Sequence, residues 1–126
     1  MKYIIDSYAW IEYLDGSAKG EKVKDILEKN NEICIISLTI AEVISRAKRK
    51  DKDAVIAYET MTANSKIIDI TSEMANDAGL FHAVIRKKIK DFGLVDSLIL
   101  ITAHKLGAKI LTGDSHFRGF KEAILI

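Results

Sequence analysis

Four acidic residues follow or interrupt apolar runs of the chain. Asp6 ends the run KYII, Glu42 comes shortly after ICIIS, Asp96 interrupts GLVDSLILITA, and Asp114 follows KILTG. A carboxylate beside isoleucine, leucine and valine is costly to desolvate unless a positive charge pairs with it. Mg²⁺ and Mn²⁺ prefer oxygen ligands, so a bound divalent cation would satisfy such carboxylates together. The four acids are therefore the candidate metal ligands.

Three of these acids also have ordinary structural explanations. Asp6 could cap the helix that follows it. Thr39-x-x-Glu42 fits a capping box, and an exposed Glu42–Arg46 pair, four residues apart, would suit the surface of a helix. Asp114, within TGDSHF, could be a turn residue. The residues alone leave these alternatives open.

Asp96 is the hardest of the four to explain structurally. Its neighbours Leu98–Ile101 make the surrounding segment apolar nearly all round, which is typical of a buried helix. No basic residue lies four positions away on either side to pair with it. Asp96 therefore carries the most weight in the prediction of a metal site.

The elements that must position these acids alternate between short apolar runs and longer segments of helical periodicity. The predicted strands are Tyr3–Ile5, Ile33–Ile36, Lys66–Ile70, Lys109–Thr112 and Ala123–Ile126, and the predicted helices are Tyr8–Leu14, Ala18–Lys29, Thr39–Lys50, Asp53–Ala63, Glu73–Lys88 and Val95–Leu106. This alternation predicts an α/β fold with a mostly parallel central sheet covered on both faces.

Such a sheet would bring the acids together. Ligands bind beyond the carboxyl ends of its strands, and Asp6 and Asp114 each follow a predicted strand. Glu42 and Asp96 are expected in the first turns of two helices, where negative charge is favourable. The four carboxylates are therefore expected to converge at one edge of the sheet.

Composition sets the outer bounds. The chain of 126 residues predicts a single domain, residues 1–126, and its net charge of +1 gives no whole-molecule argument for binding nucleic acid. The single cysteine, Cys34, lies in an apolar run and is expected to be a buried, reduced side chain, as in a cytoplasmic protein. No signal peptide is recognisable, and the longest apolar stretch is too short to span a bilayer.

Two basic runs offer local positive charge for a phosphate backbone. One contains Arg46 and Arg49 and begins one helical turn after Glu42; the other contains Lys87 and Lys88 and precedes Asp96. These four basic residues are the candidate substrate contacts, with Arg118 and His116 as further candidates. The alternative is that both runs are solvated helix faces.

Taken together, these motifs resemble those of the PIN-domain nucleases, and especially the VapC-like toxins. The matching segments are IIDSYAWIEYL, SLTIAEV and GLVDSLILITAHKLGAKILTGDSHF, so the resemblance covers essentially the whole chain. The residues from Asp51 to Lys90 match only in helical character. The resemblance implies a three-layer α/β/α sandwich.

The resemblance also implies an activity and a site. It implies a ribonuclease that uses Mg²⁺ or Mn²⁺ to hydrolyse RNA, acting as a homodimeric toxin with a cognate antitoxin protein. Metal binding falls on the acidic positions that match the family motif, and Ser7 and Thr112 match hydroxyl positions that support the metal ligands. The metal ligands and catalytic residues so implied are Asp6, Glu42, Asp96 and Asp114.

Two other classes of function remain open. A phosphatase could use Asp6 as its nucleophile, but such sites commonly have a second aspartate two residues on, where this chain has Tyr8. A non-catalytic module of the same fold could bind RNA or a protein without cutting. Metal-dependent cleavage of RNA that is lost on Asp96→Asn would favour the nuclease over both alternatives.

Overall fold

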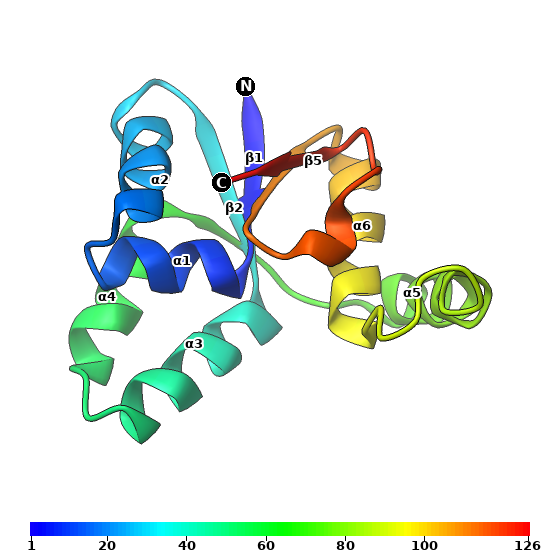
Figure 1. Cartoon of the computed structure of the whole chain (residues 1–126), viewed down its shortest axis with the longest axis horizontal. Coiled ribbons are helices and arrows are strands. Elements are labelled where there is room, and N and C mark those ends of the chain that lie inside the picture. Colours follow the sequence, from blue (N-terminus) through cyan, green and yellow to red (C-terminus); the bar gives the residue numbers. More distant parts are fainter.

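A computed structural model describes residues 1–126 and contains a five-stranded, all-parallel sheet. The strand order is β3-β2-β1-β4-β5, so β1 lies at the centre and pairs with β2 on one side and β4 on the other (Figure 1). The strands are β1 Lys2–Ile5, β2 Glu32–Ile36, β3 Lys66–Ile68, β4 Lys109–Thr112 and β5 Ala123–Leu125.

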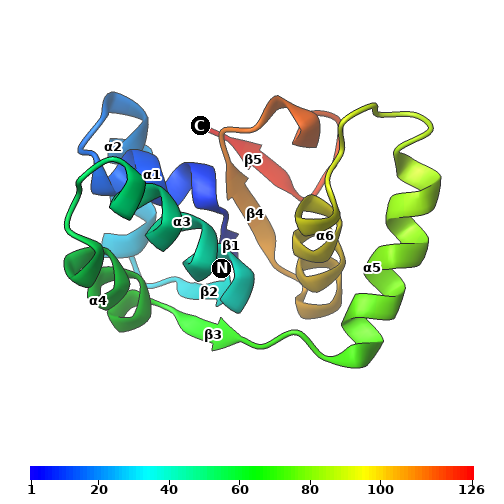
Figure 2. The same ribbon diagram turned by 90° about the horizontal axis from the view of Figure 1, so that it is seen from below.

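Helices cover both faces of this sheet. Figures 1 and 2 show α1 to α4 on one side of the strands and α5 and α6 on the other. The predicted three-layer α/β/α sandwich with a parallel central sheet is therefore confirmed. The helices are α1 Ser7–Leu14, α2 Ala18–Glu28, α3 Ser37–Arg49, α4 Ala54–Asn64, α5 Ser72–Ile85 and α6 Leu94–Leu106, followed by the short 3₁₀ helix η1 Ser115–Phe117. None of these helices is long and apolar enough to cross a membrane.

Alternate residues of the strands supply two hydrophobic cores, one on each face of the sheet. Ile4 and Cys34 pack with α5 and α6, whereas Ile5 and Ile35 pack on the opposite face with Trp10 of α1. This division follows from the period of two along a strand. Because central parallel strands are covered on both faces, they appear in the sequence as unbroken apolar runs. Cys34 is buried, as its apolar run predicted.

Helices α1 and α2 meet at an unusually close approach, at Gly20. A Cβ atom built on Gly20 would overlap with the backbone of Glu12 and Tyr13 in α1. The turn between the two helices is fixed by Ser17, whose hydroxyl accepts a 3.0 Å hydrogen bond from the Gly20 N–H. Only glycine therefore fits at this crossing, which fixes α1, and with it the residues at its start, against the rest of the layer.

Several predicted boundaries were wrong. The helix predicted as Glu73–Lys88 ends at Ile85, so Lys87 and Lys88 lie in a turn, where their N–H groups bond to carbonyls only three residues back. The strand predicted to reach Ile70 ends at Ile68, since β3 pairs with β2 for only three residues. The helix predicted to start at Thr39 starts at Ser37.

A candidate metal site at the carboxyl edge of the sheet

The site lies beyond the ends of two neighbouring strands. β1 and β4 pair in parallel, with Ile5 opposite Leu111, so their carboxyl ends lie side by side. Asp6 directly follows β1, and Asp114 comes two residues after the end of β4. Asp96 comes from the first turn of α6 and Glu42 from α3. The four predicted acids thus come from four different segments that meet at this edge.

Asp6 is almost completely buried, with 5% of its surface exposed. Its Oδ1 accepts a 2.9 Å hydrogen bond from the N–H of Ala9, so Asp6 caps α1, as the structural alternative predicted. Burial nonetheless raises the pKa of Asp6 from 3.8 to about 7, while the Thr112 hydroxyl and the Ala9 N–H oppose the shift and the charges of Asp114 and Asp96 add to it. Capping therefore does not by itself satisfy this carboxylate.

Asp96 lies at the third position of α6 and is half-buried. Its Oδ2 accepts a 2.9 Å hydrogen bond from the N–H of Gly93, the residue that caps the helix. The partner expected for Asp96 is thus partly supplied by backbone, which spacing between charged residues could not show. Burial raises the pKa of Asp96 and the charge of Asp114 adds to the rise, whereas the Gly93 N–H and the charge of His116 oppose it.

Glu42 does not lie in the first turn of its helix, where it had been predicted. Because α3 begins at Ser37, Glu42 lies in its second turn rather than its first, beyond the reach of the helix N-terminus. The capping box was wrong as well: Ile36 is the capping residue, and the Thr39 hydroxyl is buried within the helix without a hydrogen-bond partner. Burial raises the pKa of Glu42, the charge of Asp96 adds to this rise, and a hydrogen bond with Ser7 opposes it. Glu42 therefore faces the start of α1 and Asp96.

Asp114 begins the 3₁₀ helix and is tied to its neighbours on both sides. Its own N–H donates to Oγ1 of Thr112 at 2.9 Å, and its Oδ1 accepts from the N–H of His116 at 2.9 Å. The imidazole Nδ1 of His116 also lies 2.8 Å from the same Oδ1. The sequence had placed His116 only among possible substrate contacts, so this role was missed; its spacing of two residues from Asp114 was the available signal.

The four acids are linked by their charges. Asp96 acts on Asp6 and on Glu42, and Asp114 acts on Asp6 and on Asp96. Asp96, Asp114 and His116 offer ligand atoms within 4.8 Å of one another. No lysine or arginine forms an ion pair with Asp6, Glu42 or Asp96. All ion pairs in the structure involve other acids.

A hard divalent cation fits this donor set. The donors are mainly carboxylate oxygens, which Mg²⁺ and Mn²⁺ prefer, with one imidazole that suits Mn²⁺ better than Mg²⁺. The raised pKa values of three of the acids show that their negative charge is poorly compensated by the protein itself. The residues present therefore fit a bound cation.

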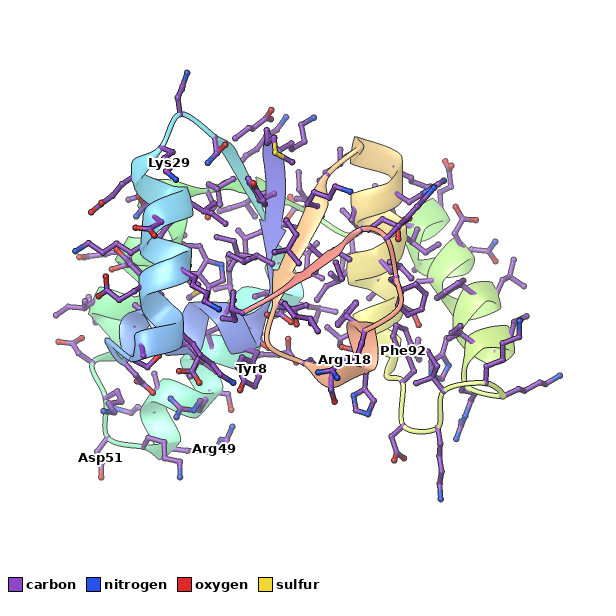
Figure 3. The ribbon with its side chains drawn as sticks, turned by 45° about the horizontal axis from the view of Figure 1, so that its top comes forward. Tyr8, Lys29, Arg49, Asp51, Phe92 and Arg118 are labelled. Carbon is purple, nitrogen blue, oxygen red and sulfur yellow. The ribbon has the colours of Figure 1, made fainter.

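The predicted substrate contacts come from α3 and from the turn after α5. Arg46 forms a 3.3 Å ion pair with Asp15 at the end of α1, so the exposed Glu42–Arg46 pair considered above was wrong. Arg49 is exposed, with its Nε 3.4 Å from the Ser45 hydroxyl, and Figure 3 shows it pointing outward from α3. Lys87 and Lys88 are exposed in the turn between α5 and α6 rather than on a helix face.

Comparison with known sequences places this arrangement in a family. The sequence profile of the PIN domain matches residues 3–123, which is nearly the whole chain. The chain belongs to the PIN-domain family. No significant match was found among curated protein sequences.

Solved structures share the PIN fold with this chain at low sequence identity. VapBC2 from Rickettsia felis, bound to a DNA fragment from its promoter, superimposes with a TM-score of 0.74 at 22% identity, covering 100% of this chain and 98% of that one. VapC20 from Mycobacterium tuberculosis, described as a sarcin-ricin loop cleaving toxin, gives 0.75 at 17% identity, covering 95% and 97%. A toxin–antitoxin complex from Klebsiella pneumoniae gives 0.73 at 20% identity, covering 97% and 95%.

Proposed function

We propose that this PIN domain is a Mg²⁺- or Mn²⁺-dependent endoribonuclease and the toxin of a toxin–antitoxin pair. The observation that carries the proposal is the convergence of Asp6, Glu42, Asp96 and Asp114 without a lysine or arginine partner for the first three. Membership of the PIN-domain family supports the nuclease activity. The resemblance to toxin structures supports the narrower assignment.

The roles of the side chains follow from their positions. Asp6, Asp96 and Asp114 would hold the cation, with His116 fixing Asp114 through its 2.8 Å contact or adding a nitrogen ligand. Ser7 and Thr112 would orient Glu42 and Asp6 through their hydroxyls. Glu42, whose carboxyl is influenced by the Ser7 hydroxyl, would orient the attacking water. A bound divalent cation supplies charge that stabilises the phosphoryl transition state and activates water.

This arrangement needs no covalent nucleophile from the protein. Water attacks the phosphorus atom, and the oxygen of the neighbouring nucleotide leaves. The products should therefore lack the 2′,3′-cyclic phosphate that attack by the ribose 2′-hydroxyl would leave. Incubation of pure protein with a 5′-labelled RNA in Mg²⁺, Mn²⁺ or EDTA tests the proposal. Cleavage only with metal, giving no cyclic phosphate, supports it; binding without cleavage would favour the non-catalytic module, and a phosphate-labelled Asp6 the phosphatase.

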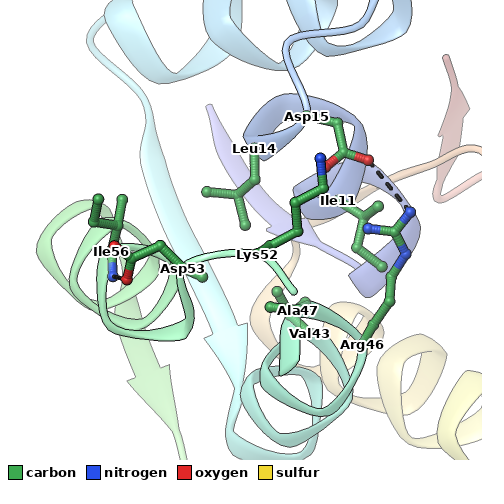
Figure 4. A pocket seen from close by; sticks show the side chains of 10 residues that line it. Ile11, Leu14, Asp15, Val43, Arg46, Ala47, Lys52, Asp53 and Ile56 are labelled. Carbon is green, nitrogen blue, oxygen red and sulfur yellow. Dashed lines mark hydrogen bonds and ion pairs between the residues drawn. The ribbon is translucent and has the colours of Figure 1, made fainter. Parts of the chain in front are cut away.

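A pocket on the α1–α4 side is consistent with a protein partner. It encloses about 150 Å³ between the end of α1, the middle of α3 and the start of α4. Figure 4 shows apolar side chains within it and the Asp15–Arg46 ion pair on its rim. We propose that an apolar segment of the antitoxin binds in this pocket. The segment would contact α3 about one helical turn beyond Glu42. Co-expression with the product of any small reading frame found immediately upstream would test this assignment, which predicts a complex that is lost on Ile56→Lys.

The homodimer belongs to the same proposal. Helix α4 exposes Val55 and Tyr58 with 66% and 51% of their surfaces accessible, and these two side chains are the candidate contact surface. Met61, at the same helical spacing, is fully buried in the core of the monomer and so does not belong to this surface. Light scattering should give a dimer at micromolar concentration, and a monomer there would reject this part of the proposal.

A further inference from the structure

An exposed aromatic side chain lies at the mouth of the acidic site and has no role in the hydrophobic core. Tyr8, in the first turn of α1, is 36% exposed, whereas Trp10, two residues further on, is completely buried. Neither of the two core clusters includes Tyr8. Core packing therefore does not account for an aromatic residue at this position.

The ring of Tyr8 is held in place by the segment that carries Asp114. A Cβ atom built on Gly113 would overlap with Cδ1 and Cε1 of Tyr8, so the ring rests directly on the Gly113 backbone. Tyr8 itself comes two residues after Asp6. The ring thus spans the two chain segments that leave β1 and β4 toward the acids. Glycine at position 113 is required because any side chain would displace the ring.

A lysine approaches the same ring at its hydroxyl. Nζ of Lys19, in α2, donates a 3.0 Å hydrogen bond to the Tyr8 hydroxyl and lies 5.3 Å from the ring centroid. Because the ammonium group is bonded to the hydroxyl, it lies near the rim of the ring rather than above its centre. Since Tyr8 is 36% exposed, part of its ring is open to solvent, with a positive charge beside it.

We propose that Tyr8 is a stacking platform for an RNA base next to the scissile phosphate, and that Lys19 contacts the phosphate beside that base. An exposed aromatic face with a neighbouring cation is the combination that binds single-stranded nucleic acid, because every base presents a π-face and every nucleotide a negative charge. Figure 3 shows Tyr8 and Arg118 at the end of the molecule where β1 and β4 terminate. The inference rests on the proposed ribonuclease function and names its substrate contact.

A purely structural role makes a different prediction. If Tyr8 only braced the Gly113–Asp114 segment, its removal would disturb the metal ligands and weaken cation binding. RNA binding without metal would not change. A stacking role predicts the reverse. Binding of RNA in EDTA and binding of Mn²⁺ without RNA therefore separate the two roles.

The test uses the full chain carrying Asp96→Asn, which prevents cleavage, and a short single-stranded RNA containing 2-aminopurine, in EDTA. Tyr8→Leu should weaken binding about 5- to 150-fold, since one stacked base contributes about 1–3 kcal/mol, and should abolish the quenching of 2-aminopurine fluorescence. Tyr8→Phe should retain both. Leu80→Ala is the control, because Leu80 is an exposed apolar side chain on α5, on the opposite face of the sheet from α1.

A second substitution tests the lysine independently. Lys19→Gln should reduce the slope of log affinity against log salt concentration by about 1, the value for one phosphate contact. Lys22→Gln, on the same helix, should leave the slope unchanged. Parental affinity and quenching in Tyr8→Leu would overturn the inference, as would weaker Mn²⁺ binding with unchanged RNA binding. If instead the unsubstituted protein fails to cleave any RNA with metal, the proposed function itself fails.

Discussion

Asp6 accepts a 2.9 Å hydrogen bond from the backbone N–H of Ala9, so one carboxylate both begins helix α1 and faces the other acids of the site. A helix cap is an ordinary structural role. Here it also fixes the direction of a candidate metal ligand. Because Oδ1 accepts this hydrogen bond, the other carboxylate oxygen is the one that the helix cap leaves available as a ligand.

The two roles of Asp6 can be separated by substitution. Asp6→Asn keeps a side-chain oxygen for the cap but removes the charge, whereas Asp6→Ala removes both. In urea unfolding at pH 7.5 without metal, Asp6→Asn should be at least as stable as the unsubstituted protein. Asp6→Ala should be less stable than Asp6→Asn by about 1 kcal/mol. Equal stability of the two variants would contradict the capping role.

The raised pKa of Asp6 predicts how metal-free stability depends on pH. Between its unfolded value of 3.8 and its folded value of about 7, the folded protein keeps a proton that the unfolded chain has released. The free energy of unfolding should therefore fall as pH rises through this range, by at most roughly 4 kcal/mol from this group, and level off above it. Glu42 and Asp96 are shifted in the same direction.

The control for this pH dependence is Asp6→Asn. The difference in unfolding free energy between the unsubstituted protein and Asp6→Asn isolates the contribution of Asp6 from other titrating groups. That difference should change across pH 4 to 7 in EDTA. A constant difference would mean that Asp6 titrates near its ordinary value in the folded protein.

Metal binding should be measurable as thermal stability. A cation that binds only the folded state raises the melting temperature by mass action, with about 2.7 kcal/mol gained at one hundred times the dissociation constant. Mg²⁺ or Mn²⁺ should therefore stabilise the unsubstituted protein, and Asp96→Asn should abolish the effect while leaving the metal-free fold intact. Calorimetry with each metal checks this. Full Mn²⁺ stabilisation of Asp96→Asn would remove Asp96 from the site.

The basic residues should act on binding rather than on chemistry. In an Asp96→Asn background, Lys87→Ala and Arg49→Ala should weaken RNA binding and flatten its salt dependence, because each lost phosphate contact releases fewer counterions. Arg46→Ala carries a second effect, since its ion pair with Asp15 is lost, at a cost within about 1 kcal/mol.

Lys29→Ala is the control for these variants, because Figure 3 shows Lys29 at the far end of the molecule from Tyr8. If the basic residues are only solvated and do not contact RNA, the RNA affinity and its salt dependence should be unchanged in every variant.

Local patterns of apolar residues were enough to predict the fold. The apolar runs around Ile4, Ile35 and Ile110 form buried central strands. Such strands appear in a sequence as nearly unbroken apolar runs, because both of their faces are covered. Strand order was not specified by these runs, because β1 pairs with both β2 and β4 through contacts far apart in the chain. The predicted start of α3 was wrong because Thr39 is a residue type that commonly caps helices. In the structure Thr39 is buried inside α3, which begins two residues earlier.

The acids were recognisable from sequence because each interrupts an apolar environment, which is costly without a partner. Their partners were not recognisable. Gly93 donates its backbone N–H to Asp96. Because every residue except proline has this donor, residue type does not reveal the contact. The pairing of Arg46 with Asp15 joins α1 to α3 across the pocket and has no short-range spacing. Tyr8 was overlooked because its significance depends on Gly113, more than one hundred residues away.

The most direct measurement is the rate of RNA cleavage by pure protein as a function of Mn²⁺ concentration, for the unsubstituted chain and for Asp96→Asn. Circular dichroism and urea unfolding would establish that both are folded. The site predicts saturable, EDTA-sensitive cleavage by the unsubstituted chain and a loss of at least about 100-fold in Asp96→Asn, the scale of removing a charge-stabilising group from a transition state. Cleavage that persists in EDTA, or an Asp96→Asn rate equal to that of the unsubstituted chain, would contradict a metal-dependent reaction at these four acids.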